Sequence, residues 1–242
     1  DNDNKPNQVV VGKSISETNA YNFYFACTVL GVGAGFYLSN VIDKPGFAAI
    51  FIIISATLYL YATSLKQMLL IGNIVVAFLL AFSVLIIGIF DLLPGINPEN
   101  RVVMADLFSI LLDYALFAFV INFIREIVKD LEDVNGDYNE GMNTLPSALG
   151  IGRTSKLVLI LSLIPLVMVI FYIKNYFFDY NLYVATFYAL ITIVAPLIYF
   201  TIKMADAKKS QDFKHLSTVL KLIILFGLFS IAIVTYNILH HA

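Results

Sequence analysis

The sequence predicts an all-α protein, a polytopic membrane bundle of about seven transmembrane helices. Hydrophobic residues make up 60% of the 242 residues and charged residues only 13%, whereas soluble domains average about 45–50% apolar and 25% charged residues. The mean hydropathy is +0.84. Apolar stretches of about 20 residues, the length that crosses the hydrocarbon core, recur along the chain. These observations indicate an integral, multi-pass membrane protein.

Short polar segments separate the apolar stretches. Ser16 and Glu17 are suited to begin the first helix, because a serine side chain can accept hydrogen bonds from the first free N–H groups. Residues 129–153 are expected to form the longest polar loop, directly after the fourth span. The predicted spans are residues 17–39, 47–64, 68–90, 105–128, 154–174, 182–203 and 217–239.

The distribution of Lys and Arg tests the number of spans, because cytoplasmic loops are enriched in both residues. When the loops are assigned to alternate sides, twelve of the 15 Lys and Arg fall on one side and only Lys44, Arg101 and Lys174 on the other. A wrong number of spans would mix the two sets. We therefore expect the side that carries Lys66 and Arg125 to face the cytoplasm.

Composition also excludes several classes of function. The formal net charge of −2 offers no basic face for nucleic acid. Cys27 is alone, so neither an internal disulfide nor a cysteine metal cluster is expected. The glycines of the first span, Gly31, Gly33 and Gly35, favour close helix packing. The chain starts at Asp1 without an initiator Met, and we expect the native chain to be longer. The sequence predicts no oligomeric state.

Three aspartates at the end of the fourth span are the strongest signal of function. At 100° per residue, Asp130, Asp133 and Asp137 fall within an arc of about 60° on a helix; we call them the acidic stripe. A solvated helix end would also carry such charges, although similar charges at helical spacing repel one another. Arg125 and Lys129 alternate with the acids, and glycines follow them. Carboxylates beside a flexible loop suit Mg²⁺, which is usually held by one or two carboxylates plus substrate phosphates.

This arrangement favours one kind of substrate, with an anionic diphosphate head and a long hydrocarbon tail. Mg²⁺ bound to the carboxylates would hold the phosphates, and Lys and Arg would neutralise the remaining charge. The tail would lie among apolar helices, where burial contributes about 0.8 kcal/mol per CH₂. Aromatic side chains would stabilise an allylic cation as the C–O bond ionises.

The segment from Arg125 to Asp137, REIVKDLEDVNGD, resembles the second aspartate-rich motif of the UbiA superfamily of intramembrane prenyltransferases. The opening residues DNDNKPN look like the end of that superfamily's first motif, N-D-x-x-D-x-x-x-D followed by N-K-P-N, with Asp1 as its last aspartate. Tyr61, Lys66 and the pair Gly72–Asn73 match its Y-x-x-x-L-K…G-N segment. The resemblance covers nearly the whole chain.

The resemblance implies a nine-helix bundle with a central cavity. Residues 1–242 would then form a single transmembrane prenyltransferase domain that lacks its first two helices. Two positions depart from the pattern, since Gln8 stands where many members carry Arg and Asp3 replaces a hydrophobic residue. Loss of that Arg would remove a phosphate contact, for which Lys5, Lys13 or Lys66 would have to compensate.

The resemblance also assigns roles to individual residues. The acidic stripe would be the catalytic set, with Asp133 and Asp137 as metal ligands and Asp1 contributing to the opposite metal site. Lys129 is either a phosphate ligand or an interfacial charge, and for Asn122 we expect a hydrogen bond within the core. The substrate-binding residues implied by the resemblance are Lys66 and Arg125 at the diphosphate, Tyr61 and Asn73 at the cleavage site, Lys129 and Lys5.

The second motif is most similar to the digeranylgeranylglyceryl phosphate synthase branch, which implies transfer of geranylgeranyl from its diphosphate to geranylgeranylglyceryl phosphate in the membrane. An aromatic acceptor (homogentisate, hydroxybenzoate or chlorophyllide type) stays open, because related branches have similar motifs. A cation transporter is a third alternative, disfavoured because the acids are expected at helix ends and in loops rather than within spans. The D-G-x-x-A-R signature of CDP-alcohol phosphotransferases is not found in the sequence.

Overall fold

The computed structural model describes residues 9–240, which contain long helices and no β-strand. Seven helical segments are long and apolar enough to cross a membrane, which confirms the predicted all-α class and the number of spans. The helices are α1 Glu17–Val41, α2 Ala48–Thr63, α3 Ile71–Ile87, α4 Arg101–Asn139, α5 Leu145–Leu149, α6 Ile151–Tyr172, α7 Tyr183–Ala189, α8 Ala195–Asp206 and α9 Ser210–Leu239.

Short 3₁₀ and π segments complete the spans. A 3₁₀ turn precedes α2, a second one joins α2 to α3, and the π segments extend α3 and α6 and join α7 to α8 into one span. Residues in π geometry leave the ordinary α-helical hydrogen-bond ladder, so the side chains around them point in altered directions. These segments are η1 Pro45–Phe47, η2 Leu65–Gln67, η3 Gly88–Leu92, η4 Leu93–Gly95, η5 Ile173–Phe178 and η6 Leu190–Val194.

The prediction of a long loop over residues 129–153 is wrong for most of these residues. Helix α4 continues to Asn139, and α5 and α6 occupy most of the remaining residues. At 1.5 Å per residue, the 39 residues of α4 measure about 58 Å, roughly twice the hydrocarbon thickness. Glu126 accepts a hydrogen bond from Lys129 one turn later at 3.1 Å, a pairing that supports helix in water. Gly141, with φ +70°, adopts the left-handed conformation that commonly terminates helices.

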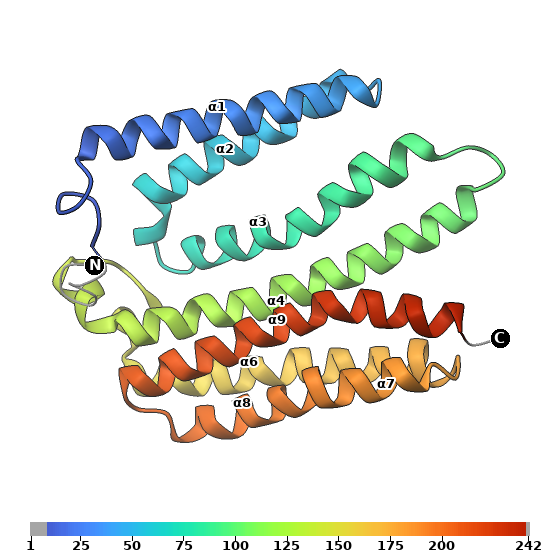
Figure 1. Ribbon diagram of the computed structural model, residues 1–242. Helices are drawn as coiled ribbons and strands as arrows, with labels where there is room; N and C mark the ends of the chain where they lie inside the picture. Colours follow the sequence, from blue (N-terminus) through green and yellow to red (C-terminus); the bar gives the residue numbers. More distant parts are fainter. Residues whose placement is uncertain (1–8, 241–242) are drawn as a thin grey trace.

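The apolar core lies among α4, α6, α7, α8 and α9. Its buried residues include Ile121 and Ile127 of α4, Leu197 and Phe200 of α8 and Leu220 of α9. Figure 1 shows α4 at the centre, with α9, α6 and the α7–α8 span on one side and α3 on the other. Burial of these side chains fixes the rotation of α4 and therefore the direction in which its polar face points.

Helices α1 and α2 form a peripheral hairpin. They pack mainly on each other and make fewer contacts with α3 (Figure 1). Phe51 of α2 also packs against Phe90 of η3, with ring centroids 5.4 Å apart. The predicted close packing at the glycines of α1 holds for Gly35 alone. A Cβ built on Gly35 would lie 2.2 Å from Cγ of Phe51, whereas Gly31 and Gly33 face open space.

Substitution Gly35→Ala is expected to weaken the α1–α2 pairing by about 1–3 kcal/mol, the usual cost of overpacking. The added methyl group meets the base of the Phe51 side chain, which cannot move without displacing the helix. Gly33→Ala is the matched control, because it gains the same helix propensity without a neighbour within 4 Å. Thermal unfolding in detergent should give a lower Tm for Gly35→Ala than for Gly33→Ala; equal values would contradict the packing argument.

Candidate active site

The acidic stripe lies along the last three turns of α4, on the side away from its buried apolar face. Burial of Ile124, Ile127 and Leu131 turns Asp130 toward α3, where Asn73 Nδ2 donates a hydrogen bond to Asp130 Oδ2 at 2.8 Å. Asn73 is itself buried, at 8% exposure. The first turn of α3 therefore holds the aspartate of the acidic stripe that lies closest to the apolar part of α4.

Glu126 extends the stripe by one more turn toward the membrane, and sequence reasoning did not assign it a role. It is only 6% exposed. Its carboxylate accepts a hydrogen bond from Arg125 at 3.1 Å and forms an ion pair with Lys129 at 3.1 Å. The signal was present in the sequence, because Glu126 precedes Asp130 by four residues and falls within the same 60° arc. Arg125 and Lys129, which are both predicted to bind the substrate, are thus held by one buried carboxylate.

Tyr61 comes to the same place from the end of α2. Its phenol is half-buried and lies within electrostatic range of Glu126 and Asp130. Residues of α2, α3 and α4 that are far apart in sequence therefore meet at one end of the bundle. Asn122, one turn further into the membrane, donates to the carbonyl of Ala118 at 2.9 Å, which confirms its expected place in the core.

The connection between α2 and α3 folds against the end of α4. The backbone N–H of Asn143 donates to the carbonyl of Gln67 at 3.1 Å. Gly72 permits this fold, because a Cβ at that position would lie 3.0 Å from the backbone of Leu65 and Lys66. Lys66 is exposed in this connection, at the end of the molecule that also carries the acidic stripe.

Asp133 and Asp137 are partly buried and lie one helical turn apart on α4. The side chain of Thr144, which precedes α5, hydrogen-bonds with Asp137. From Glu126 to Asp137 the stripe rises by about 16 Å along the helix, so its members are spread out. Accordingly, among residues 9–240 no three His, Cys, Asp or Glu side chains converge as a metal site.

The donor set still fits a hard cation such as Mg²⁺. Asp133 and Asp137 supply two carboxylates at i, i+4 spacing, and one or two carboxylates plus substrate oxygens usually suffice for this ion. Asp1, the third predicted metal ligand, and Lys5, a predicted substrate ligand, lie outside the described residues.

Comparisons with known proteins show the family of this chain. The sequence profile of the UbiA prenyltransferase family matches residues 1–225. The chain belongs to the UbiA prenyltransferase family. This UbiA chain is 32% identical to the digeranylgeranylglyceryl phosphate synthase of Korarchaeum cryptofilum over 69% of its own length and 53% of the relative. It is 36% identical to the enzyme of the same name from Methanopyrus kandleri, over 62% and 48%.

Longer matches extend across most of the UbiA chain. The digeranylgeranylglyceryl phosphate synthase of Methanobrevibacter smithii is 29% identical over 97% of this chain and 77% of the relative. With the K. cryptofilum and M. kandleri enzymes, the chain aligns over only about half of their length. A solved structure, described as giving insights into digeranylgeranylglyceryl phosphate synthase in membranes, has a similar fold. Its TM-score is 0.60 at 24% identity, over 98% of this chain and 76% of that structure.

Substitution Glu126→Gln should destabilise this UbiA chain by about 1–3 kcal/mol, the usual penalty for leaving charged partners without their carboxylate. The penalty stays below that of a fully buried pair because the Lys129 side chain is 39% exposed. Glu99→Gln, an exposed residue before α4, is the control. Thermal unfolding in detergent is the measurement, and a wild-type Tm for Glu126→Gln would show that the ion pairs add no stability.

Proposed function

We propose that this protein is a Mg²⁺-dependent prenyltransferase that transfers a geranylgeranyl group from its diphosphate to a lipid acceptor, geranylgeranylglyceryl phosphate, releasing diphosphate. The observation that carries the proposal is the acidic stripe of α4, held by Asn73 and flanked by Arg125 and Lys129 at one end of an apolar bundle. The names of the relatives from K. cryptofilum, M. kandleri and M. smithii support the choice of acceptor.

The proposed active site faces the cytoplasm. Lys66 lies at the end of the bundle that carries the acidic stripe, and so does the start of α9, because Ser210 donates to the carbonyl of Glu132 at 2.9 Å. Lys208 and Lys209 precede Ser210. Cytoplasmic ends of membrane helices are enriched in such residues, which supports this orientation.

Each side chain has a separate task in the proposed reaction. Asp133 and Asp137 would hold Mg²⁺, which when bound neutralises the diphosphate and makes it a better leaving group. Arg125 and Lys129 would bind phosphate oxygens. A buried donor supports this role for Arg125, since its Nε has no hydrogen-bond partner within the described part of the chain, and a buried N–H normally has one.

Glu126 would position the substrate-binding groups without touching the substrate, whereas Asn73 would both border the cleavage site, as predicted from the resemblance, and position Asp130. Glu126 fixes Arg125 and Lys129 in one geometry, and Asn73 fixes Asp130. Tyr61, close to both carboxylates, would border the position where the allylic C–O bond breaks. Preorganised charges of this kind lower the barrier because they need no rearrangement as the negative charge develops on the leaving group.

In the full-length protein, Asp133→Ala and Asp137→Ala are each expected to reduce diphosphate release by about 10²–10³-fold, the effect of removing one preorganised electrostatic group. Asp179→Asn, an exposed aspartate between η5 and α7, should retain wild-type release. Diphosphate release is measured from geranylgeranyl diphosphate in detergent, with circular dichroism to verify folding. Full activity in both alanine variants would contradict the proposal.

The same assay tests the requirement for the metal and the requirement for the acceptor independently. Release should stop after chelation and resume when Mg²⁺ is added back, and it should require geranylgeranylglyceryl phosphate. Release that depends on homogentisate instead would retain the prenyltransferase activity and reject the lipid acceptor. Release that persists without any divalent ion would reject the metal role of Asp133 and Asp137.

A further inference from the structure

A second polar site lies within the apolar part of the α4 span, away from the acidic stripe. Asp113 is on α4, 17 residues before Asp130, which corresponds to about 25 Å along the helix. The expectation that acids occur only at helix ends and in loops is therefore wrong for this residue. An ionisable side chain within a membrane helix is costly and usually faces a cavity or a partner.

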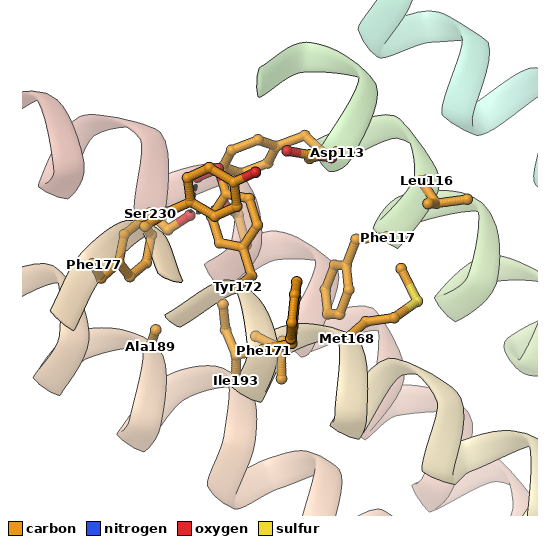
Figure 2. A pocket seen from close by; sticks show the side chains of 14 residues that line it. Asp113, Leu116, Phe117, Met168, Phe171, Tyr172, Phe177, Ala189, Ile193 and Ser230 are labelled. Atoms are coloured by element: carbon orange, nitrogen blue, oxygen red, sulfur yellow. Dashed lines mark hydrogen bonds between the residues drawn. The ribbon is translucent and has the colours of Figure 1, made fainter. Parts of the chain in front are cut away.

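Asp113 lines a cavity of about 220 Å³ within the helical bundle. Residues of α4, α6, α7 and α9 and of the π segments η5 and η6 line it. Figure 2 shows the polar Asp113 and Ser230 along one edge of this cavity and the apolar Ala189, Ile193 and Met168 along the opposite edge. Its volume far exceeds the roughly 10–15 Å³ that one water molecule requires.

Backbone geometry and small residues keep the cavity open. Tyr176 and Phe177 belong to η5 and Ile193 to η6, and π segments inside α-helices occur frequently at functional sites. Gly227 of α9 lines the cavity, and a Cβ there would meet no atom within 4 Å. A larger residue at Gly227 would therefore project into the empty space.

Aromatic rings surround the carboxylate side of the cavity. Tyr172 lies within electrostatic range of Asp113, and its ring centroid is 4.7 Å from that of Tyr176 and 5.4 Å from that of Phe177. The Tyr114 hydroxyl is already paired with Ser230 at 2.7 Å. Among residues 9–240, Asp113 forms no hydrogen bond or ion pair. A carboxylate among aromatic faces attracts organic cations, by charge and by the ring quadrupoles.

We propose that this cavity is a binding site for an amphiphilic amine, a ligand with a small ammonium head and a hydrocarbon tail. The head would sit between Asp113 and the rings of Tyr172 and Tyr176. The tail would leave between α4 and α6, where Leu116 and Phe171, both lining residues, are 53% and 65% exposed. The negative charge of Asp113 disfavours phosphate and other anionic heads, so this ligand differs from the substrate of the prenyltransferase site.

Calorimetric titration with hexyltrimethylammonium tests the site, with the full chain in a maltoside detergent that carries no cationic group. We expect saturable binding with one site per chain. Asp113→Asn and Gly227→Leu should each weaken binding by at least about tenfold, the first by removing the charge and the second by filling the cavity. Asp106→Asn should bind as wild type does, because Asp106 is an exposed aspartate two turns earlier on α4 that does not line the cavity.

Hexanol and hexyl sulfate, with tails of the same length, identify the interaction that matters. Equal binding of hexanol would overturn the proposal, since the cavity would then select only apolar chains. Wild-type binding by Asp113→Asn or by Gly227→Leu, or no saturable binding by the wild type, would also overturn it. If Gly227→Leu does not fold by circular dichroism, Gly227→Ala, whose methyl group meets no atom, replaces it with a smaller expected loss.

Discussion

The packing of α4 between α3 and the remaining bundle is the constraint on which both polar sites depend. Its buried residues, among them Ile121, Ile127 and Leu131, leave one rotation of the helix about its axis. That rotation directs Asp130 to Asn73 and brings Asp113 to the cavity near Tyr172. Because one continuous helix carries both aspartates, a change in its register would move both sites together.

Buried charges near the end of α4 are compensated locally. Glu126 is paired with cations one and three residues away, and Asp130 accepts a hydrogen bond from Asn73 of α3. A buried carboxylate without such partners would be strongly destabilising. The pairing also keeps Arg125 and Lys129 in place before a phosphate arrives, which reduces the side-chain ordering that binding has to overcome.

The two groups of helices differ in how much apolar side-chain surface they bury. The α4–α9 bundle buries large side chains such as Phe200 and Phe213, whereas α1 and α2 bury only Gly35, Ser39 and Ala48. Apolar packing among the helices therefore holds the first group together far more firmly than the α1–α2 hairpin. Tyr61, at the end of α2, joins the proposed active site from this loosely packed side.

Composition and spacing alone determined the all-α membrane class, the seven spans and the acidic stripe, because these follow from hydropathy and from 100° per residue. The tertiary structure decided the rest. It extended α4 through the predicted loop, made Glu126 the partner of Arg125 and Lys129, and turned Asp113 toward a cavity. Such features depend on which residues of other helices face each side chain, and local sequence does not encode contacts between distant segments.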